Sequence, residues 1–120
     1  MKVRCLRILD ALGSPMNQGT TWLKVGHVYQ VLSILIEPSR TRLRLIGDEP
    51  TPALFDPGMF EVVSNKLPAV WVVESPKPGW LSLGPREWSK LGFWDDYFNG
   101  EPGATACFER CRLEITQSDP

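Results

Sequence analysis

The sequence predicts an α+β fold: a small curved antiparallel sheet or partly open β-barrel, with a hairpin and C-terminal helices packed on it. Short apolar stretches separated by Pro and Gly turns fill the first half, and apolar residues at helical spacing dominate the end. The 120 residues, 42% hydrophobic and 22% charged, suit one compact domain. We expect residues 1–66 to form its small-barrel-like β part and residues 67–120 its hairpin and helical segment.

Short strands are expected throughout the barrel-like part. Strand propensity and turn residues place them at 2–9, 28–37, 41–46 and 60–63. The third of these alternates most cleanly, with Leu43 and Leu45 on one face and Arg42 and Arg44 on the other. We therefore expect the two pairs of side chains on opposite faces of the sheet, with Leu45 in the core.

A hairpin and short helical pieces are expected next. Residues 70–74 and 80–83 flank a turn at Lys77-Pro78-Gly79. Pro85 suits the first turn of a helix, where its missing N–H costs little. Residues 85–91 and 93–98 are therefore predicted to be short helical pieces, interrupted near Gly92.

A longer helix is predicted at the C-terminal end. Ala104, Cys107, Phe108, Cys111 and Ile115 recur on one helical face, with charged residues mostly elsewhere. Combining this face with the strands gives the expected core, which contains Leu45, Phe60, Val62, Trp71, Val73, Cys107, Phe108 and Cys111.

The first half contains the short motifs Gly26-His27-Val28-Tyr29 and Gly47-Asp48. They resemble those of the small Src-homology-type β-barrel of many bacterial and phage proteins, in which a Gly-x-x-Tyr enters the second strand and an Asp-containing turn follows the third. The stretch 55–63 matches the short helical turn that precedes their last strand. The resemblance implies a fold more than a function, because such barrels host many roles.

Composition and motifs argue against catalysis. His27 is the only histidine, and no nucleophile elbow, phosphate-binding glycine loop or His-Glu-x-x-His is present. The neighbouring Asp95 and Asp96 would not converge on one atom if helical. Cys107 and Cys111 could share a metal only if Cys5 or His27 completed the site, and they suit the apolar face better. We expect no enzyme, no cofactor and no metal.

Charge and cysteine usage favour a cytoplasmic protein. Three cysteines without close pairing argue against a disulfide framework, and neither a membrane-length apolar run nor a signal-peptide pattern is present. The net charge of -1 is unevenly divided. Residues 1–68 carry eight basic and six acidic residues, whereas residues 69–120 carry five basic and eight acidic ones. The C-terminal part is therefore the acidic end.

The leading functional hypothesis concerns residues 88–98, which hold five of the twelve aromatic residues. On a helix, Phe93 and Tyr97 share one line and Trp94 and Phe98 another, so one pair can be buried while the other is partly exposed. The alternative is that the whole cluster packs into the core. The expected partner-binding residues are Trp88, Trp94, Asp95, Asp96, Tyr97 and Glu101.

With its size and expected compartment, this acidic, tryptophan-rich segment resembles small bacterial immunity proteins. The resemblance implies a non-enzymatic immunity or inhibitor protein that docks on a basic surface of a cognate toxin. Aromatic anchors would supply contact area and carboxylates would supply steering.

Two other classes stay open. Arg40, Arg42 and Arg44 lie at strand spacing and could follow nucleic-acid phosphates, with Tyr29 as a stacking partner. The alternative for these arginines is a solvated face on which they pair with Glu37 or Glu61. The third class is a scaffold or self-association module built on the exposed aromatics. The sequence does not define the oligomeric state.

Overall fold

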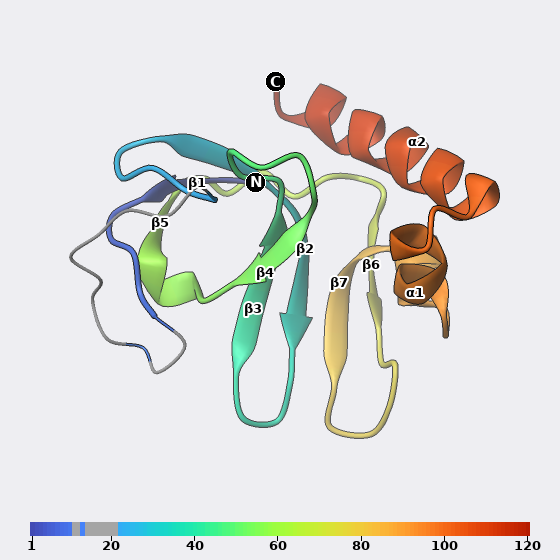
Figure 1. Cartoon of the computed structure of the whole chain (residues 1–120). Coiled ribbons are helices and arrows are strands. Elements are labelled where there is room, and N and C mark those ends of the chain that lie inside the picture. Colours follow the sequence, from blue (N-terminus) through green and yellow to red (C-terminus); the bar gives the residue numbers. More distant parts are fainter. Residues whose placement is uncertain (11–12, 14–21) are drawn as a thin grey trace.

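The computed structural model describes residues 1–10, 13 and 22–120 and has the predicted α+β architecture (Figure 1). Within this described part, seven antiparallel strands form an open sheet that does not close into a barrel, and a C-terminal helix packs on it. The strands are β1 (Lys2–Cys5), β2 (Val28–Ile36), β3 (Thr41–Leu45), β4 (Ala53–Phe55), β5 (Phe60–Ser64), β6 (Trp71–Glu74) and β7 (Leu81–Pro85). The helices are the 3-10 turns η1 (Pro57–Met59) and η2 (Arg86–Ser89), with α1 (Phe93–Phe98) and α2 (Pro102–Ser118).

The long strand β2 joins the two parts of the sheet. Its first residues pair with β1 and its last three with β7, while β3 lies along its other edge. The register with β3 shifts between Val31 and Ser33, an irregularity of the kind that bends a strand. β2 can therefore belong to the curved β1–β5 part and also pair with the β6–β7 hairpin. These two parts of the sheet lie on opposite sides of the picture in Figure 1.

Two hydrophobic clusters lie on either side of this shared strand. Val31 belongs to the cluster under the curved part, together with Leu43 and Leu45. Its neighbour Leu32 belongs to the cluster under the helices, because successive strand residues point to opposite faces. Trp71 packs against both clusters. The alternation predicted for β3 is therefore confirmed, since its two leucines share one cluster.

Helix α2 covers the second cluster with its predicted apolar face. Phe108, Cys111 and Ile115 are buried, and Ala104 and Cys107 pack against them. The far end of the helix is attached to β2, where the Gln30 amide Nε2 donates to the backbone oxygen of Ile115 at 3.2 Å. The Ser64 hydroxyl also donates to the Asp119 carboxylate at 2.7 Å. These contacts fix the helix across the sheet.

Several expected elements need correction. The first strand ends at Cys5 rather than continuing to residue 9, and the three-residue strand β4 was not predicted. Val62 and Val73 are 55% and 64% exposed, so their assignment to the core was wrong. Both lie on edge strands, β5 and β6, which pair on one side only.

Phe60, Trp71 and Cys107 are half-buried at the margins of the two clusters, while Leu45, Phe108 and Cys111 are buried as expected. Among the described residues, no helix combines the length and apolar character needed to cross a membrane.

Candidate functional site

The aromatic residues of the 88–98 segment gather around Phe108 of α2. The Trp88 ring stacks on Phe108 with 5.0 Å between ring centroids, and the Tyr97 ring lies 4.6 Å from it. Trp94 contacts the rings of Trp88, Phe93, Tyr97, Phe98 and Phe108. Most of the segment therefore supports the helical layer from beneath.

The two aromatic lines differ in burial. Phe93 is buried and Tyr97 half-buried, whereas Trp94 is half-buried and Phe98 is 54% exposed. Burial also raises the pKa of the Tyr97 hydroxyl. The line of Trp94 and Phe98 is thus the more exposed one, and Phe98 is its outermost ring.

Trp88 does not lie where a partner could reach it. Its side chain is 4% exposed and belongs to the cluster of buried residues beneath α2. It was expected among the partner-binding residues because it begins the aromatic segment, but η2 turns it inward. Trp88 therefore acts as a core residue, and the accessible part of the segment begins at α1.

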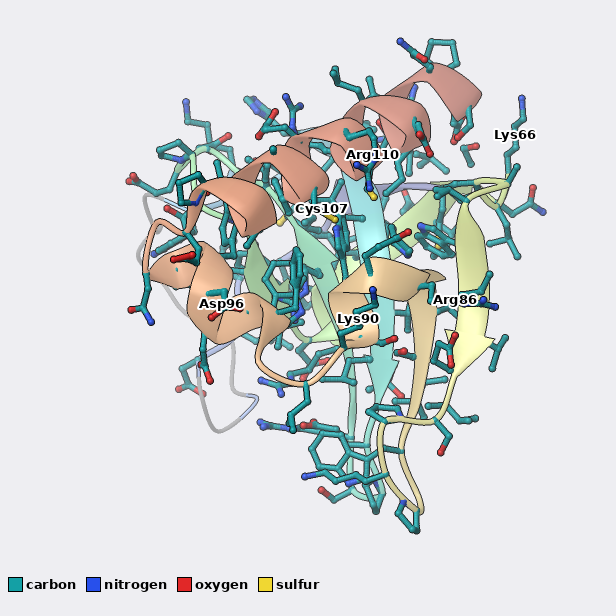
Figure 2. The ribbon with its side chains drawn as sticks, turned by 90° about the vertical axis from the view of Figure 1, so that its right-hand side faces the viewer. Lys66, Arg86, Lys90, Asp96, Cys107 and Arg110 are labelled. Atoms are coloured by element: carbon teal, nitrogen blue, oxygen red, sulfur yellow. The ribbon has the colours of Figure 1, made fainter. Side chains whose placement is uncertain are left out.

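Three carboxylates lie on α1 or shortly after it. Asp95, Asp96 and Glu101 are all exposed, and no ion pair joins any of them to another described residue. Figure 2 shows Asp96 at one end of this side of the molecule, with Lys90 and Arg110 further along it. Asp95, Asp96, Phe98 and Glu101 are hereafter called the α1 surface.

The three predicted arginines have separate roles. Arg40 and Arg42 both bind the carboxylate of Glu37, the latter through Nη2 at 2.8 Å. Arg44 is buried, and its guanidinium lies 3.6 Å from the centre of the Trp94 ring. The alternative expectation, in which these arginines pair with a carboxylate, therefore describes Arg40 and Arg42. This pairing does not favour three free arginines that could follow nucleic-acid phosphates.

Tyr29 is likewise engaged inside the structure. Its hydroxyl donates to the Asp48 carboxylate at 3.1 Å and accepts from the backbone N–H of Lys24 at 2.9 Å. Burial raises the pKa of this hydroxyl. Only 8% of the residue is exposed, so its ring offers little area for stacking of a base.

Comparison with known proteins found no relative of this chain. No family model, no curated protein and no solved structure matches this chain.

Within the described residues, the histidine and cysteine side chains do not come together in one cluster. His27 is exposed at the entrance to β2, beside the Tyr29 ring. Burial, together with the Cys107 thiol, raises the pKa of the Cys111 thiol to about 11, which suits a core residue rather than a nucleophile. In the part of the chain that the structure describes, no three His, Cys, Asp or Glu side chains are placed to hold a metal ion.

Two residues between β6 and β7 were not predicted from the sequence to belong to any site. Lys77 and Trp80 were interpreted only as parts of a hairpin, but the Lys77 ammonium lies 4.0 Å from the centre of the Trp80 ring. A Lys-x-x-Trp spacing across a Pro-Gly turn was the available signal, since such a turn brings its two ends together.

Replacing Glu37 with Gln is expected to lower the melting temperature by a few degrees, because it removes the carboxylate that Arg40 and Arg42 share. Although burial opposes it, hydrogen bonding from the two arginines lowers the pKa of Glu37 below its ordinary value of 4.5. The stability that this carboxylate contributes is therefore fully present above pH 4.5 and is lost as pH falls through the lowered pKa.

Thermal unfolding of wild type and Glu37→Gln between neutral pH and pH 3 checks this, with the difference expected to shrink in acid. Glu114→Gln, an exposed carboxylate in no described ion pair, is the control. A difference that does not change with pH would contradict the assigned role of the Glu37 charge.

Proposed function

We propose that this chain is a non-enzymatic binding protein of the immunity or inhibitor type, which docks through its α1 surface on a basic surface of a partner protein. In the specific form of the proposal the partner is a cognate toxin and the host is a bacterium. A cytoplasmic location is part of the proposal, in keeping with three cysteines that are all free.

The observation that carries the proposal is the combination of free carboxylates and an exposed ring. Asp95, Asp96 and Glu101 are exposed and unpaired within the described structure, and Phe98 is 54% exposed beside them. Exposed carboxylates raise association rates with basic surfaces, and an aromatic ring supplies area that a partner can desolvate.

Packed aromatic rings support the α1 surface. Trp94 and Tyr97 contact both Phe98 and the buried Phe108, so the exposed ring rests on side chains that are themselves packed against the core. A preordered surface loses less side-chain freedom on binding than a mobile one does. This favours α1 as a recognition element.

Charge reversal of the α1 surface tests the proposal. The double variant Asp95→Lys/Asp96→Lys is expected to weaken binding to the protein encoded by the adjacent gene by tenfold or more, which corresponds to about 1.4 kcal/mol. It should also flatten the salt dependence of the association rate, because long-range attraction between opposite charges is lost. Surface plasmon resonance at two ionic strengths measures both quantities.

A matched control separates the site from net charge. Glu49→Lys/Glu114→Lys changes the net charge equally at positions outside the α1 surface, and neither residue forms an ion pair among the described residues. The control should retain most of the affinity. If both double variants weakened binding equally, or if neither changed the affinity, the α1 surface would not be the interface.

A scaffold that self-associates through the same surface is distinguished by sedimentation. The proposal expects a monomer in dilute solution and a heteromeric complex only with the partner. A wild-type dimer that Phe98→Ala dissociates would instead assign the surface to contact between copies of this chain.

A further inference from the structure

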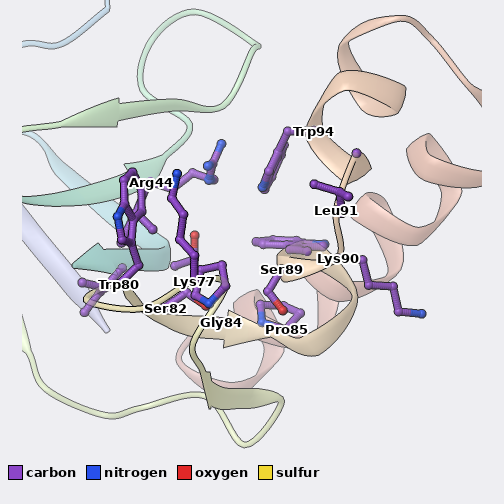
Figure 3. A pocket seen from close by; sticks show the side chains of 16 residues that line it. Arg44, Lys77, Trp80, Ser82, Gly84, Pro85, Ser89, Lys90, Leu91 and Trp94 are labelled. Atoms are coloured by element: carbon purple, nitrogen blue, oxygen red, sulfur yellow. The ribbon is translucent and has the colours of Figure 1, made fainter. Parts of the chain in front are cut away.

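A pocket of about 310 Å³ lies between the β2–β7 part of the sheet and the η2–α1 segment (Figure 3). Its lining contains three tryptophans, Trp80, Trp88 and Trp94, and three cations, Arg44, Lys77 and Lys90. None of its sixteen lining residues is acidic. Its volume is at the lower end of the roughly 300 to 1,000 Å³ of small-molecule sites. The site is therefore aromatic and positively charged, although the chain as a whole is slightly acidic.

Arg44 is the most unusual group in this lining. Its side chain comes from the next-to-last residue of β3 and is 9% exposed, yet among the described residues no carboxylate pairs with it and no acceptor takes its hydrogen bonds. Burial lowers the pKa of its guanidinium to about 10, which leaves it charged at neutral pH. A buried charge without a counter-charge is costly, and a bound anion would supply the missing partner.

Lys77 is the second cation of this pocket. Figure 3 shows Trp80 and Lys77 on one side of the pocket and Trp94 and Leu91 on the other, with Arg44 between them. The Lys77 ammonium lies 4.0 Å from the centre of the Trp80 ring, and the Arg44 guanidinium lies 3.6 Å from that of Trp94. The Lys90 side chain points away from the pocket, so it contributes its stem rather than its charge. Two cations and two indoles thus surround one opening.

We propose that this pocket binds a nucleotide unit, with its phosphate on Arg44 and Lys77 and its base stacked on the indole of Trp80. The Arg44 guanidinium already covers the Trp94 ring, whereas the exposed Lys77 side chain can leave the Trp80 ring to meet the phosphate. A terminal phosphate carries nearly two negative charges at neutral pH, which matches the two cations. Planar guanidinium groups bind phosphate through paired N–H donors, and bases stack on tryptophan whatever their sequence. The pocket shares no residue with the α1 surface, so this site is separate from the proposed protein-binding function.

Tryptophan fluorescence and calorimetry with matched probes test the site. Adenosine monophosphate is expected to quench the fluorescence saturably. Adenosine and inorganic phosphate should each bind at least about tenfold more weakly, because adenosine lacks the phosphate and inorganic phosphate lacks the base. Equal binding of all three probes, or binding of none, would overturn the proposal.

Three variants assign the binding to the pocket. Arg44→Met retains the aliphatic stem, Lys77→Met removes a charge from an exposed hairpin turn, and Trp80→Leu removes one stacking surface. Each is expected to weaken adenosine monophosphate binding by about tenfold or more. Lys66→Met, an exposed lysine outside the lining, is the control and should bind as wild type does.

The variants also keep the test independent of folding. Lys77 is exposed, so its replacement leaves the core intact even if Arg44→Met perturbs β3. Wild-type affinity in a folded Lys77→Met and a folded Trp80→Leu, judged by circular dichroism, would refute the assignment, as would equal loss in Lys66→Met.

The source of the nucleotide is settled by a further comparison. A short oligoadenylate that binds more tightly than the monophosphate, with a steep dependence on salt, would identify single-stranded nucleic acid as the source. Equal or weaker binding of the strand would identify a free nucleotide.

Discussion

Replacing Phe108 with alanine is expected to lower the free energy of unfolding by about 3 to 5 kcal/mol, the range found for large aromatic truncations in cores. Phe108 has no exposed surface and lies at the centre of the cluster beneath α2. It stacks on Trp88 and also contacts Trp94 and Tyr97. Its removal leaves a cavity bounded by rigid rings, which cannot collapse easily, so the cost should fall in the upper part of this range.

Phe98→Ala provides the matched control for this prediction. It truncates the same side chain from a ring that is 54% exposed, although that ring also contacts Trp94 and Tyr97. Its expected cost is below about 1 kcal/mol, as for most surface changes. Urea unfolding followed by near-ultraviolet circular dichroism measures both variants. Similar losses in the two would mean that Phe108 is not the centre of the helical layer.

The fold class followed from the sequence because the local patterns were strong. The alternation in residues 41–46 placed Leu43 and Leu45 in one cluster, and the apolar face of α2 was assigned correctly. In contrast, β4 has only three residues and follows closely after Pro50 and Pro52, so neither length nor periodicity could identify it. Val62 and Val73 carry the composition of core strands, and only the topology shows that they lie on edges.

The sites were harder to predict because they depend on contacts between distant segments. The arginine face of β3 was evident from the sequence, but the position of Trp94 over Arg44 requires α1 to pack next to β3, which is about 50 residues earlier in the chain. Trp80 approaches the same space only because β7 pairs with the end of β2, where Leu81 lies opposite Ile36. Pairings of this kind join residues about 45 positions apart, and no local pattern specifies them.

The second large effect is expected at Gly47, in the turn after β3. A Cβ atom there would lie 2.0 Å from the backbone oxygen of Trp22, far inside van der Waals contact. The same oxygen accepts a hydrogen bond from the Asp48 N–H at 2.7 Å, and Asp48 in turn accepts from the Tyr29 hydroxyl. Even the smallest side chain must therefore displace the backbone before β2 and strain the link between the two segments.

Gly47→Ala is accordingly expected to cost roughly 2 to 4 kcal/mol, from overpacking against a backbone atom together with the loss of a backbone hydrogen bond. Gly103→Ala is the control, because a Cβ at that position in the first turn of α2 meets no atom within 4 Å. In a helix this second change should stabilise the protein by up to about 1 kcal/mol, since alanine loses less backbone freedom than glycine does. Opposite signs in the two melting-temperature shifts would establish that close approach, rather than glycine flexibility, explains Gly47. A Gly47→Ala protein as stable as wild type would mean that the Trp22 carbonyl does not lie against this turn.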